Sequence, residues 1–421
     1  MLAPQQWIWG VVGVATGAVI LRPWRWPEAV WAVAGALALV GFGLLPAAQA
    51  WRGVLRGEDV YLFLAGMMLL SEMARREGVF DWLAALAARR AGGSGSRLFA
   101  WVYVVGTLVT VFLSNDATAV VLTPAVFAVA RAVGASPLPY LFICAFVANA
   151  ASFVLPISNP ANLVLWGGHM PSLPQWLALF ALPSLASIAA TFLALRFALR
   201  RDIDATIRTE VPPSPLSRGG QLAAGGLAVS VVVLVACAWM RVPLGWPTLG
   251  AALVTLVLLR AGCGSPTWPA VRAVSWSVLP LVAGLFVFVQ ALEYTGVVGL
   301  LASALRHAAT AWPGGADVGV GALLGIAANL VNNLPAGLLA GAALDAANAS
   351  PSMRAAALMG IDIGPNLSIT GSLATLLWLA ALRREGESVS GWQFLRLGAW
   401  VMPMGLGAAL LTLWLTHVAL R

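Results

Sequence analysis

The chain has 421 residues, of which 60% are hydrophobic and only 10% are charged, and its mean hydropathy is +0.89. A soluble domain of this composition could not cover its core with polar surface, so a soluble globular protein is excluded. The net charge of +8 comes from 24 basic residues, all arginine, which lie between apolar segments; this pattern favours membrane topology over nucleic-acid binding.

The first half of the chain is predicted to cross the membrane five times. Apolar stretches of about 17 to 25 residues are long enough for a membrane-spanning helix. They lie near 7–22, 28–50, 58–74, 138–170 and 173–199. Val79–Ala91, after the third stretch, is amphipathic and is expected to lie in the membrane interface. Met1–Trp9 lacks the positive charge of a cleaved signal segment.

Two segments of this half depart from ordinary crossings. Region 97–133 holds two apolar arms of about 16 residues, short for a span, and is predicted to be a re-entrant hairpin with Ser114-Asn115-Asp116 at its tip. The crossing at 138–170 is interrupted by Pro156-Ile157-Ser158-Asn159-Pro160-Ala161-Asn162. Because proline removes a backbone donor, this segment is expected to unwind and offer polar groups to a ligand; a simple proline kink is the alternative.

The second half repeats the plan after a proline-rich linker at 201–219. Its predicted elements are crossings near 221–240, 243–261 and 274–294, an amphipathic Val297–Ala309, a hairpin at 315–348, a broken crossing at 353–382 and a final crossing near 392–418. The second hairpin has Asn332-Asn333 at its tip. Gly364-Pro365-Asn366-Leu367-Ser368-Ile369-Thr370-Gly371-Ser372 forms the second break.

Several features recur at a spacing of 218 residues. Asn115 matches Asn333, Ala65-Gly66 matches Ala283-Gly284, and Gly78 matches Gly296. We therefore predict an all-α polytopic membrane protein made of two repeats, 1–200 and 220–421. Each repeat has five crossings, and an odd number inverts the second repeat. Inverted repeats with matching polar breaks are typical of secondary transporters, whose substrate site forms between the repeats.

The arginines orient this arrangement. With the amino terminus outside, 18 arginines fall inside and six outside, as the positive-inside rule requires. Both termini are then periplasmic and the 201–219 linker is cytoplasmic. The first hairpin opens to the cytoplasm and the second opens to the outside.

The four breaks supply amides and hydroxyls but no arginine. The candidate substrate groups are Ser114, Asn115, Ser158, Asn159, Asn162, Asn332, Asn333, Asn366, Ser368 and Thr370. A carboxylate or phosphate site normally supplies a cation or a metal ion, so this set favours a neutral, hydroxyl-bearing solute. Helix N-termini also hold anions, so the argument against an anionic substrate is a weak one.

Three carboxylates are candidates for proton coupling, because ionisable groups at membrane depth are costly. Asp116 at the first tip leads, with a helix cap as its alternative role. Asp362, just before the second break, comes next. Glu72 is third, and an ion pair with Arg75 or Arg76 is the stronger expectation for it.

Thiol and metal chemistry are not favoured. Cys144, Cys237 and Cys263 lie on separate predicted elements and are expected to be apolar filler rather than a thiolate site. The three histidines show no metal-ligand spacing. No metal and no cofactor are expected.

Four segments carry a family resemblance. Phe112–Pro124, Ile157–Leu163, Asn332–Leu338 and Asp362–Thr375 resemble the arsenite and antimonite efflux permeases of the ion transporter superfamily. The resemblance implies export of arsenite and antimonite driven by proton entry, in a bacterial inner membrane. It also implies elevator motion of paired hairpins, as in sodium–dicarboxylate relatives. Some relatives dock a soluble ATPase; the sequence leaves that partner and the oligomeric state open.

Two other functions fit the sequence less well. A membrane enzyme is disfavoured, because the sequence has no HExxH or GxSxG motif and its charged loops are short. A proton- or sodium-coupled carrier of a di- or tricarboxylate, or of another small solute, on the same scaffold is the stronger competitor.

Overall fold

The computed structural model describes residues 4–203, 206–208 and 215–419. Within these ranges the chain forms helices and no β-strand; an isolated bridge pairs Ser94 with Thr206. Part of the predicted 201–219 linker therefore lies outside the described residues.

The helices of the first half and of the second half follow the predicted order. They are α1 (Pro4–Leu21), η1 (Pro23–Arg25), α2 (Glu28–Gly41), α3 (Ala47–Arg56), α4 (Glu58–Arg76), α5 (Val79–Ala91), α6 (Gly95–Phe112), η2 (Ala117–Leu122), α7 (Thr123–Ala132), α8 (Leu138–Ala150), η3 (Pro156–Ser158), α9 (Pro160–Trp166), η4 (Gly167–His169), α10 (Leu173–Ala198), α11 (Arg200–Ile203), α12 (Arg218–Met240), α13 (Gly245–Cys263), α14 (Thr267–Ala273), α15 (Val278–Tyr294), α16 (Val297–Ala311), α17 (Ala316–Val331), α18 (Asn333–Ala346), α19 (Pro351–Ile363), η5 (Gly364–Leu367), α20 (Leu373–Arg384) and α21 (Gly391–Ala419).

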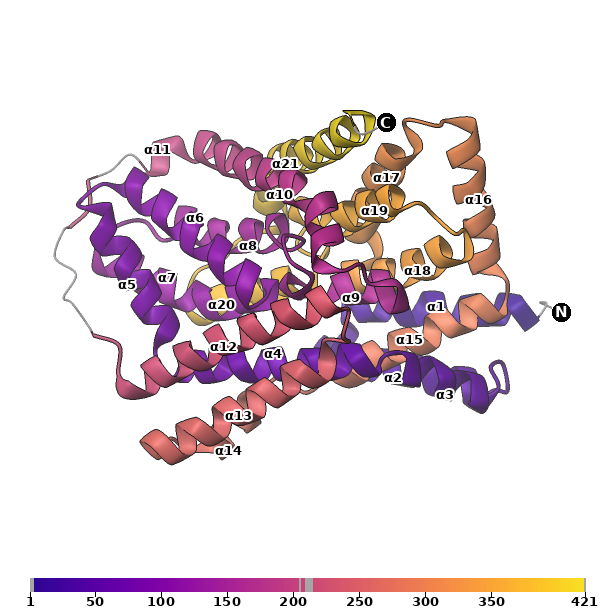
Figure 1. Ribbon diagram of the computed structural model, residues 1–421, viewed down its shortest axis with the longest axis horizontal. Helices are drawn as coiled ribbons and strands as arrows, with labels where there is room; N and C mark the ends of the chain where they lie inside the picture. The colour runs from indigo at the N-terminus through magenta and orange to yellow at the C-terminus, as the bar shows by residue number, and fades with distance from the viewer. Residues whose placement is uncertain (1–3, 204–205, 209–214, 420–421) are drawn as a thin grey trace.

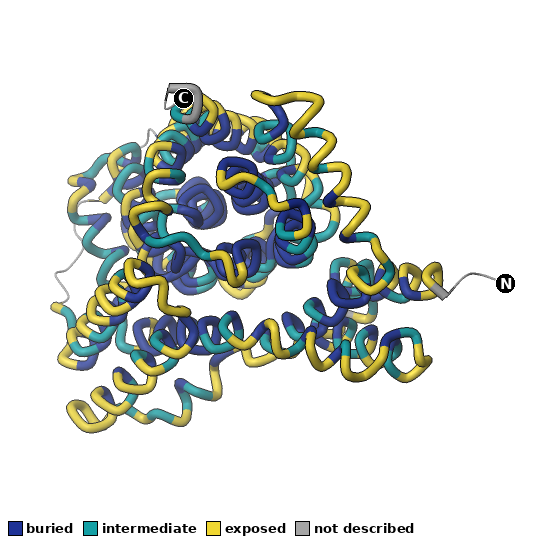
Figure 2. Tube along the Cα trace, turned by 45° about the vertical axis from the view of Figure 1, so that its right-hand side comes forward, coloured by how far each residue is buried: buried dark blue, intermediate teal, exposed yellow. Residues whose placement is uncertain are grey.

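These helices form two layers (Figures 1 and 2). The scaffold layer consists of α1–α4 and α12–α15, in which α4 packs against α13 and α2 packs against α15. The hairpin layer consists of α6–α10 and α17–α21, in which α10 packs against α21 and α17 against α19. The chain passes from one layer to the other through α5 and α16.

The two halves run in opposite directions through this arrangement. In Figure 1, α5 stands at the left end and α16 at the right end, and α1 and α12 point in opposite directions. The helix starts keep the spacing of 218 residues, since α5 begins at Val79 and α16 at Val297, while α10 begins at Leu173 and α21 at Gly391. The predicted all-α fold with two inverted halves is confirmed.

Both predicted hairpins turn where the polar residues interrupt the apolar sequence. α6 ends at Phe112, and α5 packs against both α6 and α7, so the two arms open on the same side. In the second half α16 likewise packs against α17 and α18. The second turn is a single residue, Asn332, whose φ of 71° and ψ of 151° lie in a region that residues other than glycine rarely adopt.

The arms of the second hairpin are positioned by glycines. Gly321 and Gly325 on α17 face Gly360 and Gly364 on α19 and η5, and a Cβ on Gly360 would overlap the carbonyl of Gly321. In lipid, small residues one turn apart allow helices to approach backbone to backbone. This contact fixes the second hairpin against the second break.

Six helices of the described part are long and apolar enough to cross a membrane: Gly95–Phe112, Leu173–Ala198, Arg218–Met240, Gly245–Cys263, Thr267–Tyr294 and Gly391–Thr416. The predicted single crossing at 28–50 is wrong in detail. It is divided into α2 and α3 by a turn in which Gly43 has a φ of 66°, followed by Pro46 at the start of α3. Proline and a left-handed glycine end helices, and the apolar pattern alone does not register this.

Candidate substrate site

The first break consists of turns and the short helix η3 between α8 and α9. α8 ends at Ala150, and Asn159 is extended with φ −152° and ψ 133°. The Asn159 side-chain oxygen accepts a hydrogen bond from the Ala161 amide at 3.0 Å and caps α9, whose first residue is Pro160. Proline at this position and asparagine as the cap both favour a helix start, so the unwinding follows from the local sequence.

The second break has the same construction. Ser368 and Ser372 are extended, and the Ser372 hydroxyl accepts from the Thr375 amide at 3.1 Å to cap α20. The two breaks therefore each place a new helix N-terminus inside the hairpin layer. Such N-termini present unpaired backbone donors to whatever lies in front of them.

Asp362 ties the two breaks together. Its side chain is fully buried, and its two oxygens accept from the Ser152 hydroxyl at 2.7 Å and from the Asn159 amide at 2.9 Å. Ser152 and Asn159 lie at either end of the first break. The carboxylate of the second half thus links the two ends of the first break.

Asn366 forms a second bridge between the halves. Its side-chain oxygen accepts from the Asn149 amide at 2.9 Å, and its own amide donates to the Phe146 carbonyl at 3.1 Å. Both asparagines are buried. Because a buried polar group without a partner is costly, these bonds define how the two breaks sit against each other.

Asn162 turns back into its own loop. Its amide donates to the carbonyls of Ser152, Leu155 and Pro156 at 2.9, 3.1 and 3.3 Å. It shapes the first break, and its nitrogen is fully used by this local network. The Asn162 side-chain oxygen is buried without a hydrogen-bond partner among the described residues, and the substrate role of Asn162 stays a prediction.

Each break also holds the hairpin of its own half, in the same way. The Ser158 hydroxyl donates to the carbonyl of Val111 at 2.9 Å, near the end of α6. The Thr370 hydroxyl donates to the carbonyl of Asn329 at 3.3 Å, near the end of α17. The acceptors Val111 and Asn329 are 218 residues apart and the donors Ser158 and Thr370 are 212 apart, so a similar bond, but not an identical one, is made in the two halves.

The second tip is bonded directly to the second break. The Asn333 amide N–H donates to the Gly371 carbonyl at 2.8 Å, and the Asn332 side chain donates to the Thr370 carbonyl at 3.3 Å. The Asn333 side chain is buried, yet it has no hydrogen-bond partner among the described residues. Its amide is therefore available to a ligand.

The first tip faces a cavity of about 110 Å³ that reaches the scaffold layer. Ser114 and Asp116 line it, together with Ser71 and Glu72 of α4 and Ser275 before α15. The Asp116 carboxylate has no hydrogen-bond partner among the described residues. The Asn115 side-chain oxygen accepts from the Asp116 amide at 2.9 Å, which leaves its own amide nitrogen free.

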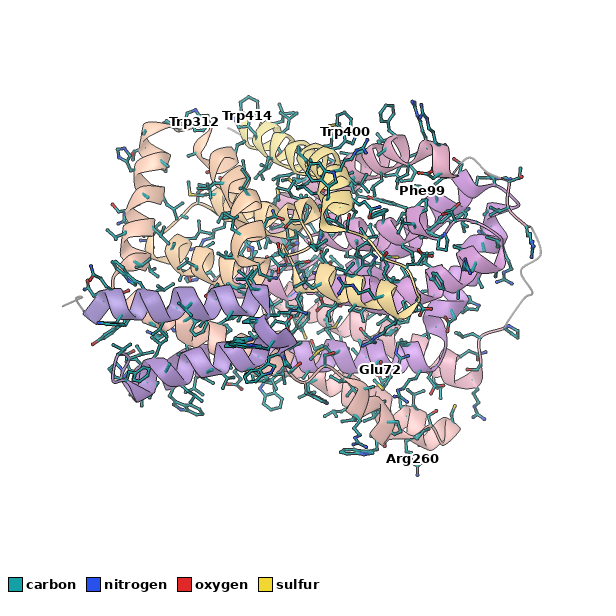
Figure 3. The ribbon with its side chains drawn as sticks, turned by 180° about the vertical axis from the view of Figure 1, so that it is seen from behind. Glu72, Phe99, Arg260, Trp312, Trp400 and Trp414 are labelled. Carbon is teal, nitrogen blue, oxygen red and sulfur yellow. The ribbon has the colours of Figure 1, made fainter. Side chains whose placement is uncertain are left out.

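Glu72 stands apart from the breaks, on α4 in the scaffold layer (Figure 3). It pairs with Arg75 at 2.6 Å and with Arg76 at 2.7 Å, so the expected ion pair is confirmed. It shares only the cavity with Asp116. Among the other predicted residues, Asn159, Asp362 and Asn366 join the two breaks. Ser114, Asn115 and Asp116 form the first tip, and Asn332 and Asn333 form the second. Ser158, Ser368 and Thr370 bond the breaks to the ends of α6 and α17.

Three residues of the network were missed from the sequence: Asn149, Ser152 and Asn329. The Asn329 side chain donates to the Gly364 carbonyl at 2.9 Å and accepts from the Ser368 hydroxyl at 2.8 Å. Asn149 and Asn329 are polar residues in the last turn of an apolar helix, immediately before a break or a tip, and Ser152 follows directly after such a helix. That position is the signal which could have found them.

No thiol or metal site is assembled in the described part of the chain. Cys144 lies buried on α8, Cys237 lies buried on α12, and Cys263 is exposed at the end of α13. No group of three His, Cys, Asp or Glu side chains is placed to hold a metal ion there.

Known proteins resemble the chain over most of its length. The family model described as citrate transporter (CitMHS) matches residues 12–361. Arsenical pump membrane proteins of Yersinia enterocolitica and of Escherichia coli strain K12 are 29% and 28% identical to it over 346 and 345 residues, which is 79% of this chain and 80% of each relative. An uncharacterized transporter of Mycobacterium tuberculosis is 28% identical over 380 residues, 86% of this chain and 87% of that one.

A solved structure shares the fold. The crystal structure of the Alcanivorax borkumensis YdaH transporter, described as having an unusual topology, aligns with a TM-score of 0.57 at 18% identity and covers 87% of this chain and 86% of its own. These proteins are membrane transporters rather than enzymes.

Proposed function

Since the chain belongs to the CitMHS citrate transporter family and is a multi-pass membrane transporter, we propose that it exports arsenite and antimonite, as neutral trihydroxides, in exchange for protons. The observation that carries the proposal is the pair of hairpin tips, which present free amide groups at Asn115 and Asn333 with no arginine in either break. Amides and hydroxyls complement a small uncharged molecule that bears hydroxyl groups.

The relatives support this substrate class. Two of them are named arsenical pump membrane proteins and align over four-fifths of their length. A bacterial inner membrane is the proposed location.

Asp116 is the proposed proton carrier. Its carboxylate has no hydrogen-bond partner among the described residues. It lines a cavity that Ser71 and Glu72 of α4 also line, so polar groups are available for proton transfer between the tip and α4. Asp362 is less suited to this role, because both of its oxygens are engaged in holding the first break. A carboxylate used as a clamp cannot exchange its proton without loosening the clamp.

A tricarboxylate such as citrate is the competing substrate, as the family description suggests. Three carboxylates would require cations, and the breaks offer none, so helix N-termini would have to hold the charge. We expect citrate to be a poor substrate.

Purified protein in liposomes tests the proposal. With a proton gradient imposed across the vesicle membrane, arsenite should accumulate on the acidic side, and excess antimonite should compete, while citrate should do neither. Accumulation that needs a sodium gradient, or transport of citrate without arsenite, would overturn it. Vesicles without protein are the control for passive leakage.

A further inference from the structure

A pocket and a groove lie at the outer end of α16, away from the substrate site. The pocket has a volume of about 300 Å³ and lies among the α16–α17 loop, the α18–α19 loop and the end of α21. The groove has a volume of about 680 Å³ and runs along α17 and α21. Four residues line both: Trp312, Gly314, Val318 and Trp414. The two spaces therefore adjoin each other.

The two spaces differ in chemistry. The groove is lined by apolar side chains and glycines, among them Ala322, Leu406, Leu410 and Leu411. The pocket adds the charged Arg306 and Asp317 and the polar Asn348 and Ser350. A polar compartment beside an apolar groove fits a molecule with a charged head and a hydrocarbon tail.

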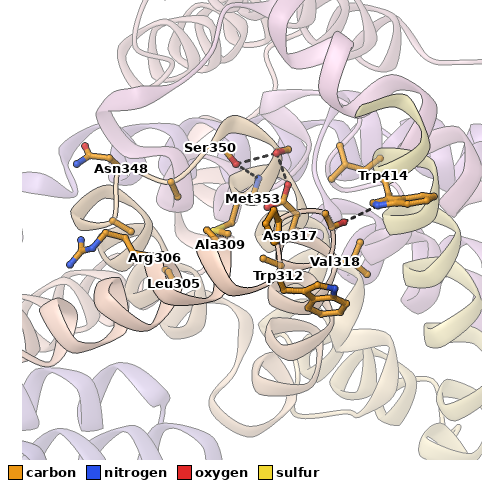
Figure 4. A pocket seen from close by; sticks show the side chains of 17 residues that line it. Leu305, Arg306, Ala309, Trp312, Asp317, Val318, Asn348, Ser350, Met353 and Trp414 are labelled. Carbon is orange, nitrogen blue, oxygen red and sulfur yellow. Dashed lines mark hydrogen bonds between the residues drawn. The ribbon is translucent and has the colours of Figure 1, made fainter. Parts of the chain in front are cut away.

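The two charged side chains of the pocket, Asp317 and Arg306, can each make further hydrogen bonds. One Asp317 oxygen accepts from the Ser352 hydroxyl at 2.6 Å, and the other accepts no hydrogen bond within the described residues. Arg306 donates to the Ala346 carbonyl at 2.9 Å through one nitrogen. Figure 4 shows both tryptophan rings on one side of Asp317, with Arg306 at the opposite side of the pocket. The pocket thus offers an acidic side and a basic side.

The position also favours lipid. Trp312 and Trp414 lie at the edge of the hairpin layer opposite the scaffold layer (Figure 3), and both rings are exposed. The Trp414 indole donates to the Gly314 carbonyl at 2.8 Å, which holds the ring at the mouth of the groove. Tryptophan gathers at the level of lipid headgroups, where one end of the ring is apolar and the other is wet.

We propose that this pocket and groove bind one zwitterionic phospholipid. Its head group lies in the pocket, with the ammonium group at Asp317 and the phosphate toward Arg306, and one acyl chain fills the groove along α17 and α21. An anionic lipid would place no cation at Asp317 and would be bound less well. The inference does not depend on the substrate proposed above.

Delipidated protein in detergent tests the inference. Phosphatidylethanolamine or phosphatidylglycerol is added, and native mass spectrometry measures how much of each lipid stays bound. The wild type should retain one phosphatidylethanolamine and prefer it over phosphatidylglycerol about threefold to fivefold, the range that a partly exposed ion pair supplies. Equal retention of the two lipids by the wild type would overturn the inference.

Three variants separate the parts of the site. Asp317→Asn keeps an acceptor for Ser352 but loses the charge, so it should erase the preference while both lipids still bind. Arg306→Gln should weaken both lipids alike, because both carry the phosphate. A Cβ on Gly407 meets no atom within 4 Å, so Gly407→Leu should fill the groove without a clash and abolish retention of both.

Matched controls exclude general effects. Glu385→Gln removes an exposed carboxylate at the end of α20, and Gly250→Leu adds a side chain on α13, where a Cβ also meets no atom within 4 Å. Both should retain phosphatidylethanolamine as the wild type does. Retention by Gly407→Leu at the wild-type level, with an unchanged melting temperature, would show that the lipid does not lie in the groove.

Discussion

At the scale of single residues, asparagines whose side chains are hydrogen-bonded and asparagines whose side chains have no partner are expected to have different roles. Asn366 is bonded at both ends of its amide and joins the halves. Asn333 is buried at a tip, and its side chain has no partner in the described chain. The first is expected to hold the fold, and the second is expected to meet substrate.

Asn333→Ala should therefore abolish arsenite resistance in a sensitive host without lowering the amount of protein. A lost hydrogen bond to a buried partner weakens binding by about 1–3 kcal/mol, roughly fivefold to 150-fold. Growth on arsenite and immunoblots of membranes measure the two effects. Asn366→Ala is the comparison, and it should lower the protein level as well. Normal resistance in Asn333→Ala would remove this tip from the substrate site.

Asp116→Asn separates coupling from binding. The amide keeps the size of the side chain but carries no exchangeable charge, so accumulation driven by a proton gradient should be lost. Exchange of arsenite for arsenite should persist, because it needs only the loaded carrier to move. Uptake into everted vesicles with an acidic interior measures the first, and exchange with labelled arsenite measures the second.

The same assays on Asp362→Asn give the contrast. The Asn159 amide would then face either an oxygen or a second amide, and the bridge between the breaks would lose strength. This variant should lose stability and both forms of transport together. If Asp116→Asn accumulated arsenite normally, the proton would have to travel by Asp362 or Glu72, and the proposed role of Asp116 would be wrong.

At the scale of helices, the close contact of α17 with α19 and η5 depends on the absence of side chains at four glycines. These are Gly321, Gly325, Gly360 and Gly364. Gly360→Ala would push a methyl group into the Gly321 carbonyl and the Gly325 amide, and this backbone cannot give way as a flexible side chain could. We expect a loss of about 1–3 kcal/mol in stability, with reduced transport, because Asn329 would no longer reach the Gly364 carbonyl. Melting curves in detergent measure it.

A glycine on an open helix face provides the control for that substitution. A Cβ on Gly299 of α16 meets no atom within 4 Å, and alanine is the better helix former. Gly299→Ala should leave the melting temperature unchanged or slightly higher. Equal melting temperatures for the two variants would show that α17 and α19 have room to part.

What the sequence could predict at this scale follows from how local each signal is. Asn332 and the Pro156–Asn162 segment interrupt apolar sequence by themselves, so the tips and breaks were predictable to within a few residues. The roles of Asn149 and Ser152 could not be predicted, because their hydrogen-bond partners Asn366 and Asp362 are more than 200 residues away in the sequence. The glycine contact between α17 and α19 could not be predicted for the same reason. The chain has 43 glycines, and those that lie in a helix contact cannot be identified until the two helices are known to pack together.

At the scale of the whole molecule, the inverted halves make a prediction about the two faces of the membrane. Single cysteines at Pro215, before α12, and at Gly314, beside α17, should react with impermeant reagents from opposite sides, with Gly314→Cys labelled from the periplasm. Cys263 is exposed and has to be replaced first, whereas Cys144 and Cys237 are buried. Labelling of both positions from one side would contradict the proposed topology.

The paired bonds of Ser158 with Val111 and of Thr370 with Asn329 have a thermodynamic consequence. Halves related in this way offer a bound molecule nearly the same surroundings whether it faces one side of the membrane or the other. Such a carrier has no preferred direction of its own, and the sign of net flux is set by the solute and ion concentrations. Cells that hold this protein under a reversed gradient should fill with arsenite rather than empty themselves of it.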